Sequence, residues 1–101
     1  MNMHNPPHPG DFIEETYMIP CGLSCRYLAE QLGVAASTLN RIIKGQSGIS
    51  PDMALRLSCV LGRTPESWLA MQDQYDLWDA RQTFNPERVH PIKLQCASNL
   101  T

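Results

Sequence analysis

Two short helical segments, separated by about three residues and each followed by a glycine, constrain the fold of this chain more than any other feature. Residues 24–32 place apolar side chains three or four positions apart, and Gly33 follows where a left-handed residue commonly ends a helix. Residues 36–44 show the same spacing and are followed by Gly45. Ala29, a small residue within the first segment, allows two helix axes to approach closely. These features predict a helix-turn-helix motif.

Three further helices are predicted around this pair, which makes the expected fold class all-α. Residues 11–18 have an apolar face and acidic residues near their start, where the helix dipole favours them, and Pro20-Cys21-Gly22 is expected to end this helix. Ser50-Pro51 and Thr64-Pro65 each place a capping hydroxyl before a proline at the first helical position. They predict helices that run to about Leu61 and from Glu66 to about Gln82.

Prolines divide the chain of 101 residues, short enough for a single domain, into three parts. Residues 1–10 form a lead-in that we expect to be extended, because its prolines lack N–H donors and restrict the residues before them. Residues 11–82 form the five-helix domain. Residues 83–101 form a short tail, predicted to be a loop or an edge strand because Pro91 is excluded from a central strand.

Basic residues are concentrated in the middle of the chain, although the formal net charge is −2. Residues 23–63 contain five basic and two acidic residues, whereas every charged residue in 1–22 and 64–80 is acidic. Local charge is what faces a phosphate backbone, so this middle part is suited to nucleic acid. No apolar run approaches the roughly 20 residues of a membrane span, and the start lacks the pattern of a signal peptide. We therefore expect no membrane association and a cytoplasmic location.

The exposed face of the second short helix is predicted to read the major groove of double-stranded DNA. Once its apolar residues are assigned to the core, the remaining side chains can all form hydrogen bonds and none is acidic. Asparagine pairs with adenine, arginine pairs with guanine, and a threonine methyl meets a thymine methyl. Early residues of such a helix meet bases, and later residues meet phosphates. We predict base contacts from Ser37, Thr38, Asn40 and Arg41, and phosphate contacts from Arg26, Lys44, Gln46 and Ser47. The alternative for the same residues is an ordinary solvated helix face.

Aromatic residues recur at helical spacing in the last predicted helix, as Trp68, Tyr75 and Trp78. Such a stripe is usually core, and we expect this for Trp68. A domain of this size does not shield so much aromatic surface alone, so Tyr75 and Trp78 are predicted to lie at an interface with a second copy. The nearby Asp73, Asp76 and Asp79 are expected to form a solvated face.

No pattern of residues predicts catalysis, a cofactor or a metal site. The four cysteines include no CxxC pair, and the histidines lack the paired spacing of a structural zinc site, so we expect reduced thiols and no bound metal. The motifs of metalloproteases, nucleotide-binding loops and serine hydrolases do not occur. We therefore expect no enzymatic activity.

Four stretches of the sequence resemble the HigA antitoxins, bacterial members of the Xre or lambda-repressor-like helix-turn-helix class: residues 5–11 (NPPHPGD), 27–34 (YLAEQLGV), 48–57 (GISPDMALRL) and 64–78 (TPESWLAMQDQYDLW). The resemblance implies a five-helix lambda-repressor-like domain, a homodimer, a palindromic operator in its own promoter and a location at the bacterial nucleoid. It also implies a partner, a HigB-type toxin that is a ribosome-dependent messenger-RNA endonuclease. Two positions depart from the pattern. The family often has a larger polar residue at Ala36, and the wider class often has a phosphate-contacting glutamine at Cys25.

Two other functions are compatible with the same residues. The chain is then either a solitary repressor without a toxin or a protein-interaction module that keeps the fold and has lost tight DNA binding. A charge reversal at Arg41 and the salt dependence of DNA binding separate the module from the two DNA-binding alternatives.

Overall fold

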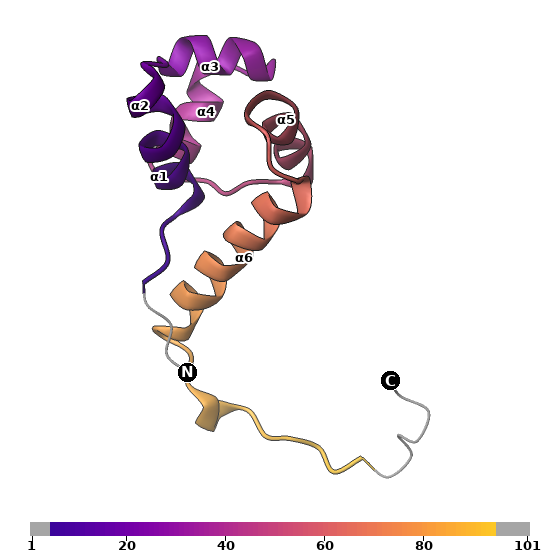
Figure 1. Cartoon of the computed structure of the whole chain (residues 1–101). Helices are drawn as coiled ribbons and strands as arrows, with labels where there is room; N and C mark the ends of the chain where they lie inside the picture. The colour runs from indigo at the N-terminus through magenta and orange to yellow at the C-terminus, as the bar shows by residue number, and fades with distance from the viewer. Residues whose placement is uncertain (1–4, 95–101) are drawn as a thin grey trace.

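The first helical segment begins earlier than the sequence predicts. The computed structural model describes residues 5–94. The chain is helical from residue 9 to residue 21, as α1 (Pro9–Ile13), η1 (Glu14–Met18) and α2 (Ile19–Cys21) (Figure 1). The prediction of an extended chain through Gly10 is therefore wrong at its last two residues. His8 caps the early start, because its Nδ1 accepts a hydrogen bond from the Gly10 N–H at 2.9 Å.

Of the predicted stop Pro20-Cys21-Gly22, only Gly22 ends the segment. The helix continues past Met18, its predicted last residue, and accommodates Pro20. The reason is the widened turn before it. η1 is a π-helix, and the N–H of Ile19 donates to the carbonyl of Glu14, five residues earlier. In an unbroken α-helix the ring of Pro20 would collide with the carbonyl four residues before it. The segment ends at Gly22, which has a φ of 67°.

The predicted helix-turn-helix is present, with boundaries within one residue of those expected. It consists of α3 (Cys25–Leu32) and α4 (Ala36–Ile43), which pack against each other. The Ser24 hydroxyl caps α3 by accepting from the Tyr27 N–H at 3.1 Å, and Gly33 ends it with a φ of 73°. Ala29 is buried between the helices, in agreement with the expected close approach.

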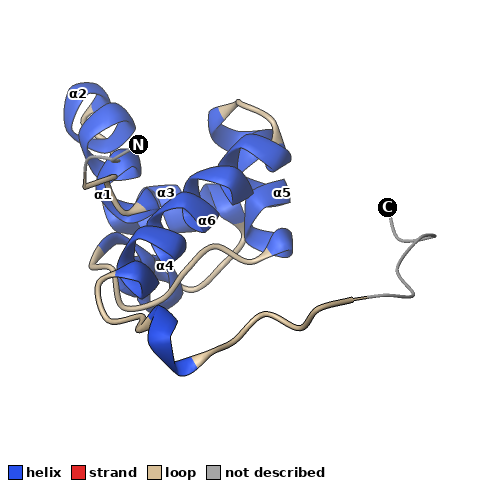
Figure 2. Cartoon of the chain, turned by 90° about the horizontal axis from the view of Figure 1, so that it is seen from below, coloured by secondary structure: helices blue, strands red, loops and turns tan. Residues whose placement is uncertain are grey.

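The last two helices, α5 (Pro51–Leu61) and α6 (Pro65–Arg81), start at the two predicted caps. Ser50 accepts from the Met53 N–H, and Thr64 accepts from the Ser67 N–H. The first turns of α6 pack on α5 and α1, and its later turns extend away from the other helices (Figure 1). Residues 9–81 thus form five helical segments, and the described residues contain no strand (Figure 2). The predicted all-α, five-helix fold class is confirmed.

The core combines side chains from all five segments. The largest fully buried apolar residues are Trp68, Ile13, Leu28, Leu39 and Leu57. The prediction that Trp68 belongs to the core is confirmed. Its indole N–H donates to the carbonyl of Gly62 at 3.0 Å, so the polar atom of the ring is satisfied as well as the apolar ones.

Gly10 brings α1 into direct contact with the backbone of α4. A side-chain carbon at this glycine would lie 2.8 Å from the Cα of Ile43 and closer still to the carbonyl oxygen of Ile42. No other residue leaves room for this approach. The start of α1 therefore supports α4 from behind, on the side opposite its exposed face.

The described part of the tail, residues 83–94, contains only a short 3-10 helix, η2 (Pro86–Arg88), and loop. The loop form of the prediction holds for these residues and the edge-strand form does not. Residues 1–4 of the lead-in and residues 95–101 of the tail, including Cys96, lie outside the described residues. Among residues 5–94, no helix combines the length and apolarity that crossing a bilayer requires.

Candidate nucleic-acid interface

The exposed face of α4 carries the side chains that the sequence predicts for reading DNA. Ser37, Asn40 and Arg41 are exposed, and Thr38 beside them is half-buried. The opposite face of the helix is buried through Leu39, Ile42 and Ile43. The structure therefore separates the two faces as predicted, and it brings the proposed base-contacting residues together on one surface.

The loop after α4 is folded back against the end of the helix. Gly45 has a φ of 77°, and the N–H groups of Gln46 and Ser47 both donate to the carbonyl of Arg41, at 2.8 and 3.3 Å. Lys44 and Gln46 are exposed and Ser47 is half-buried. The three predicted phosphate-contacting residues of this region thus lie directly beside the exposed face of α4.

The beginnings of α3 and α4 are adjacent. The Cys25 thiol donates to the carbonyl of Ala36 at 3.7 Å. Arg26, the next residue, is exposed in the first turn of α3, where the free N–H groups of a helix attract anions. Arg26, which is predicted to contact a phosphate, therefore lies at the same end of the helix-turn-helix as Ser37.

Arg56 has a structural role that the sequence analysis missed. It was counted only among the positive charges, but its guanidinium donates to the carbonyls of Leu32 and Gly33, at 2.8 and 3.2 Å, and to the carboxylate of Asp52 at 2.8 Å. It therefore ties α5 to the turn of the helix-turn-helix. The pair with Asp52 could be read from its four-residue spacing, whereas the contacts with the turn span more than twenty residues and leave no local signal.

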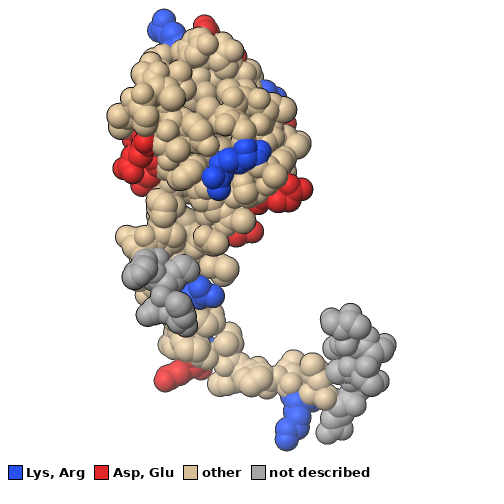
Figure 3. All heavy atoms as spheres, viewed as in Figure 1, with Lys and Arg blue, Asp and Glu red and all other residues tan. Residues whose placement is uncertain are grey.

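The positive charges near α4 are free of salt bridges. Within residues 5–94, Arg26, Arg41 and Lys44 form none, and the Arg56–Asp52 pair is the one that the described residues contain. On the face drawn in Figure 3, basic side chains are scattered over the globular part, and acidic ones lie on both of its flanks. Arg26, Arg41 and Lys44, which have no carboxylate partner among residues 5–94, remain available to a phosphate backbone.

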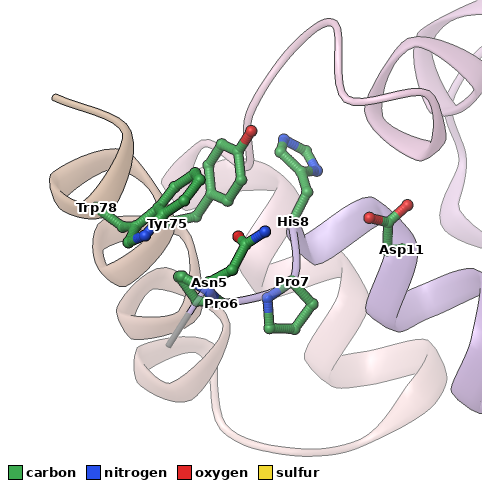
Figure 4. A pocket seen from close by; sticks show the side chains of 7 residues that line it. All are labelled: Asn5, Pro6, Pro7, His8, Asp11, Tyr75 and Trp78. Carbon is green, nitrogen blue, oxygen red and sulfur yellow. The ribbon is translucent and has the colours of Figure 1, made fainter. Parts of the chain in front are cut away.

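Tyr75 and Trp78, the predicted interface residues, are half-buried beside the lead-in. With residues 5–8 and Asp11 they line a cavity of about 340 Å³ (Figure 4). The Tyr75 ring packs edge-on against His8, with 4.9 Å between ring centroids, and lies 6.0 Å from the Trp78 ring. The chain's own lead-in therefore covers part of the aromatic surface that was predicted for a second copy.

Comparison with known proteins places this geometry in context. A family model described as helix-turn-helix matches residues 15–69. The chain is 35% identical to YddM of Escherichia coli K12, an HTH-type transcriptional regulator by name, with 94% of this chain and 100% of the relative covered. It is 35% identical to antitoxin HigA-1 of Vibrio cholerae, with 81% and 77% covered. A solved structure of antitoxin GraA in complex with its operator has a TM-score of 0.81 and 40% identity, with 93% of this chain and 98% of that chain covered.

Proposed function

The chain belongs to the helix-turn-helix family that includes the HigA antitoxins, and we propose that it is a DNA-binding antitoxin of the bacterial cytoplasm and nucleoid, without enzymatic activity. In this function it binds a palindromic operator, represses its own operon and neutralises a HigB-type messenger-RNA endonuclease. The observation that carries the proposal is the exposed face of α4, which combines hydrogen-bonding side chains with exposed cations in a fold similar to that of an operator-bound antitoxin.

The roles of individual residues follow from their positions on the motif. Ser37, Thr38, Asn40 and Arg41 contact base edges, because they lie on the first two turns of a helix that fits the major groove. Arg26, Lys44, Gln46 and Ser47 contact phosphates at the two ends of the helix-turn-helix and set its register on the duplex.

Self-association through the end of α6 completes the proposal. Tyr75 and Trp78 are half-buried in the monomer, and Leu77 and Phe84, in the last turns of α6 and just beyond it, are exposed. A second copy that covers this surface produces a dimer with two reading helices. Such a dimer binds half-sites roughly 34 Å apart, or one turn of the duplex.

An operator-binding titration tests the DNA-binding function. The labelled duplex is the region upstream of the chain's own gene, and the variants are Arg41→Ala and, as a charge-matched control, Arg88→Ala in the tail. We expect Arg41→Ala to weaken binding by about tenfold or more, because it removes a bidentate base contact. We expect the wild-type logarithmic affinity to fall with logarithmic salt at about 0.9 per neutralised phosphate. Equal losses in both variants, or no salt dependence, would contradict the proposal.

A solitary transcriptional regulator is the second candidate, because YddM, which matches nearly the whole chain, is named as a regulator and not as an antitoxin. Co-expression with the product of the neighbouring gene distinguishes the two. A stable complex, together with rescue of growth from that product, supports the antitoxin function. Operator binding without either result supports the solitary regulator.

A further inference from the structure

Gln72 is a buried polar residue of α6 that connects this helix to the loop after α4. Its side chain is 7% exposed, although glutamine is usually a surface residue. Its Oε1 accepts a hydrogen bond from the N–H of Ile49 at 2.9 Å. Ile49 is itself buried, so this bond satisfies a backbone donor that water does not reach.

Asp76 determines which end of the glutamine amide faces the loop. The Gln72 Nε2 donates to the Asp76 Oδ1 at 2.9 Å, one turn further along α6. A carboxylate accepts hydrogen bonds and does not donate them, so the NH2 end of the amide is directed to Asp76. The oxygen end is left for Ile49. The side chain is therefore fixed at both ends of its amide group.

The loop backbone lies directly against this amide. A side-chain carbon at Gly48 would be 2.9 Å from the Cδ of Gln72, closer than such atoms normally come. At its other end the loop is held by the carbonyl of Arg41, which accepts from Gln46 and Ser47. The segment from Lys44 to Ile49 is thus attached to α4 at its start and to α6 at its end.

We propose that Gln72 is a positioning residue for DNA binding: it holds the loop of residues 44–49 in the conformation in which Lys44, Gln46 and Ser47 meet phosphates. This inference rests on the proposed function. A loop that is already ordered loses little conformational freedom on binding, whereas a released loop has to be ordered by the DNA. Gln72 itself does not contact the duplex in this role. It acts through Gly48 and Ile49.

Gln72→Met tests this role, and Gln74→Met is the matched control, because Gln74 is exposed on the same helix. Methionine keeps the length of the side chain and the helix propensity but cannot accept the Ile49 bond. Amide hydrogen exchange measures how well the loop is ordered in the absence of DNA. We expect Gln72→Met to accelerate exchange at Ile49 by about tenfold or more, while the amides of α4 keep their rates. Unchanged exchange at Ile49 would overturn the proposal, whatever the protein binds.

Operator titrations of the same two variants at several salt concentrations measure the consequence. We expect Gln72→Met to weaken operator binding by about tenfold, and to reduce the salt slope by roughly one to two phosphate contacts. Gln74→Met is expected to match the wild type in both. If Gln72→Met lowers thermal stability but keeps the wild-type affinity and slope, the residue is only structural and the proposal fails. If the wild type itself does not bind, the proposed function fails, and this inference fails with it even where the exchange result holds.

Gly48→Ala approaches the same contact from the loop side. The added methyl group displaces the Gln72 amide, so we expect a smaller loss of operator affinity in the same direction. Combined with Gln72→Met it is expected to cause less than the sum of the two losses, because the hydrogen bond to Ile49 that both variants disturb can be lost only once. Additive losses in the double variant would show that the two residues act separately and would overturn the proposal.

Discussion

The two halves of α6 have opposite environments. In its first half, Trp68 is fully buried and Gln72 is 7% exposed, and both donate or accept hydrogen bonds with neighbouring segments. In its second half Leu77 is 54% exposed, and Phe84 just beyond the helix is 59% exposed. The first half of α6 thus belongs to the core, and its second half lies at the surface. Apolar residues at regular spacing therefore do not all belong to the core, even within one helix.

Replacement of a tryptophan in each half gives the largest expected difference. Trp68→Ala is expected to lower the free energy of unfolding by about 3–5 kcal/mol, because it empties a fully buried site. Trp78→Ala is expected to lower it by about 1 kcal/mol or less in dilute monomer, because the ring is only half-buried. Urea unfolding curves measure both. Equal losses would show that the second half of α6 is also part of the core.

Gly10 and Gly22 also differ in their environments, the first being buried and the second exposed. Gly10→Ala is expected to lower the free energy of unfolding by about 1–3 kcal/mol or more, because the new methyl group meets the backbone of α4. A methyl group at Gly22 would meet no other atom, and only the left-handed φ of this residue opposes the substitution. We therefore expect Gly22→Ala to lower the free energy of unfolding by about 1 kcal/mol. Thermal unfolding of the two variants measures the difference. A larger loss at Gly22 would contradict the close approach of α1 to α4.

Arg56→Met is expected to have a smaller effect on stability. It removes the hydrogen bonds to the carbonyls of Leu32 and Gly33, which are partly exposed, and we expect a loss of about 1 kcal/mol in the free energy of unfolding. Arg81→Met, at the exposed end of α6, is the control and is expected to be neutral. A neutral result for Arg56→Met would show that the turn holds its conformation without α5.

The smallest expected effect on folding is at the exposed end of α6. Leu77→Ser is expected to change the free energy of unfolding of the monomer by no more than about 0.5 kcal/mol, because its side chain is largely in solvent. Under the proposed dimer, the same change weakens self-association, which sedimentation equilibrium measures over a range of concentrations. A substantial loss of monomer stability would remove the contrast between the two halves.

Local signals in the sequence predict most of the fold. The starts of α5 and α6 follow from a hydroxyl residue before a proline, and the ends of α2 and α3 fall at glycines in the left-handed region. The exposed face of α4 follows from the spacing of its apolar residues. All these signals act within one or two helical turns, so they can be read without knowledge of tertiary contacts.

The features that the sequence did not predict depend on contacts between distant residues or on an unusual turn. Gln72 meets Ile49 across 23 residues, and Arg56 meets Leu32 across 24. Neither contact has a pattern of its own in the sequence. A proline normally ends a helix, but Pro20 lies inside one, and the π-helix that accommodates it has no recognised local signal.

The contact of Gly10 with α4 has a consequence for how binding specificity can change. It reaches the backbone of Ile42 and Ile43, and the buried side of α4 supplies the rest of the support. Neither depends on the side chains at Ser37 or Asn40, which are exposed. Those positions can be exchanged for other residues while the helix keeps its place. If these residues read bases as proposed, the preference for an operator sequence can be changed, by evolution or by design, through substitutions that leave the folding of the chain intact.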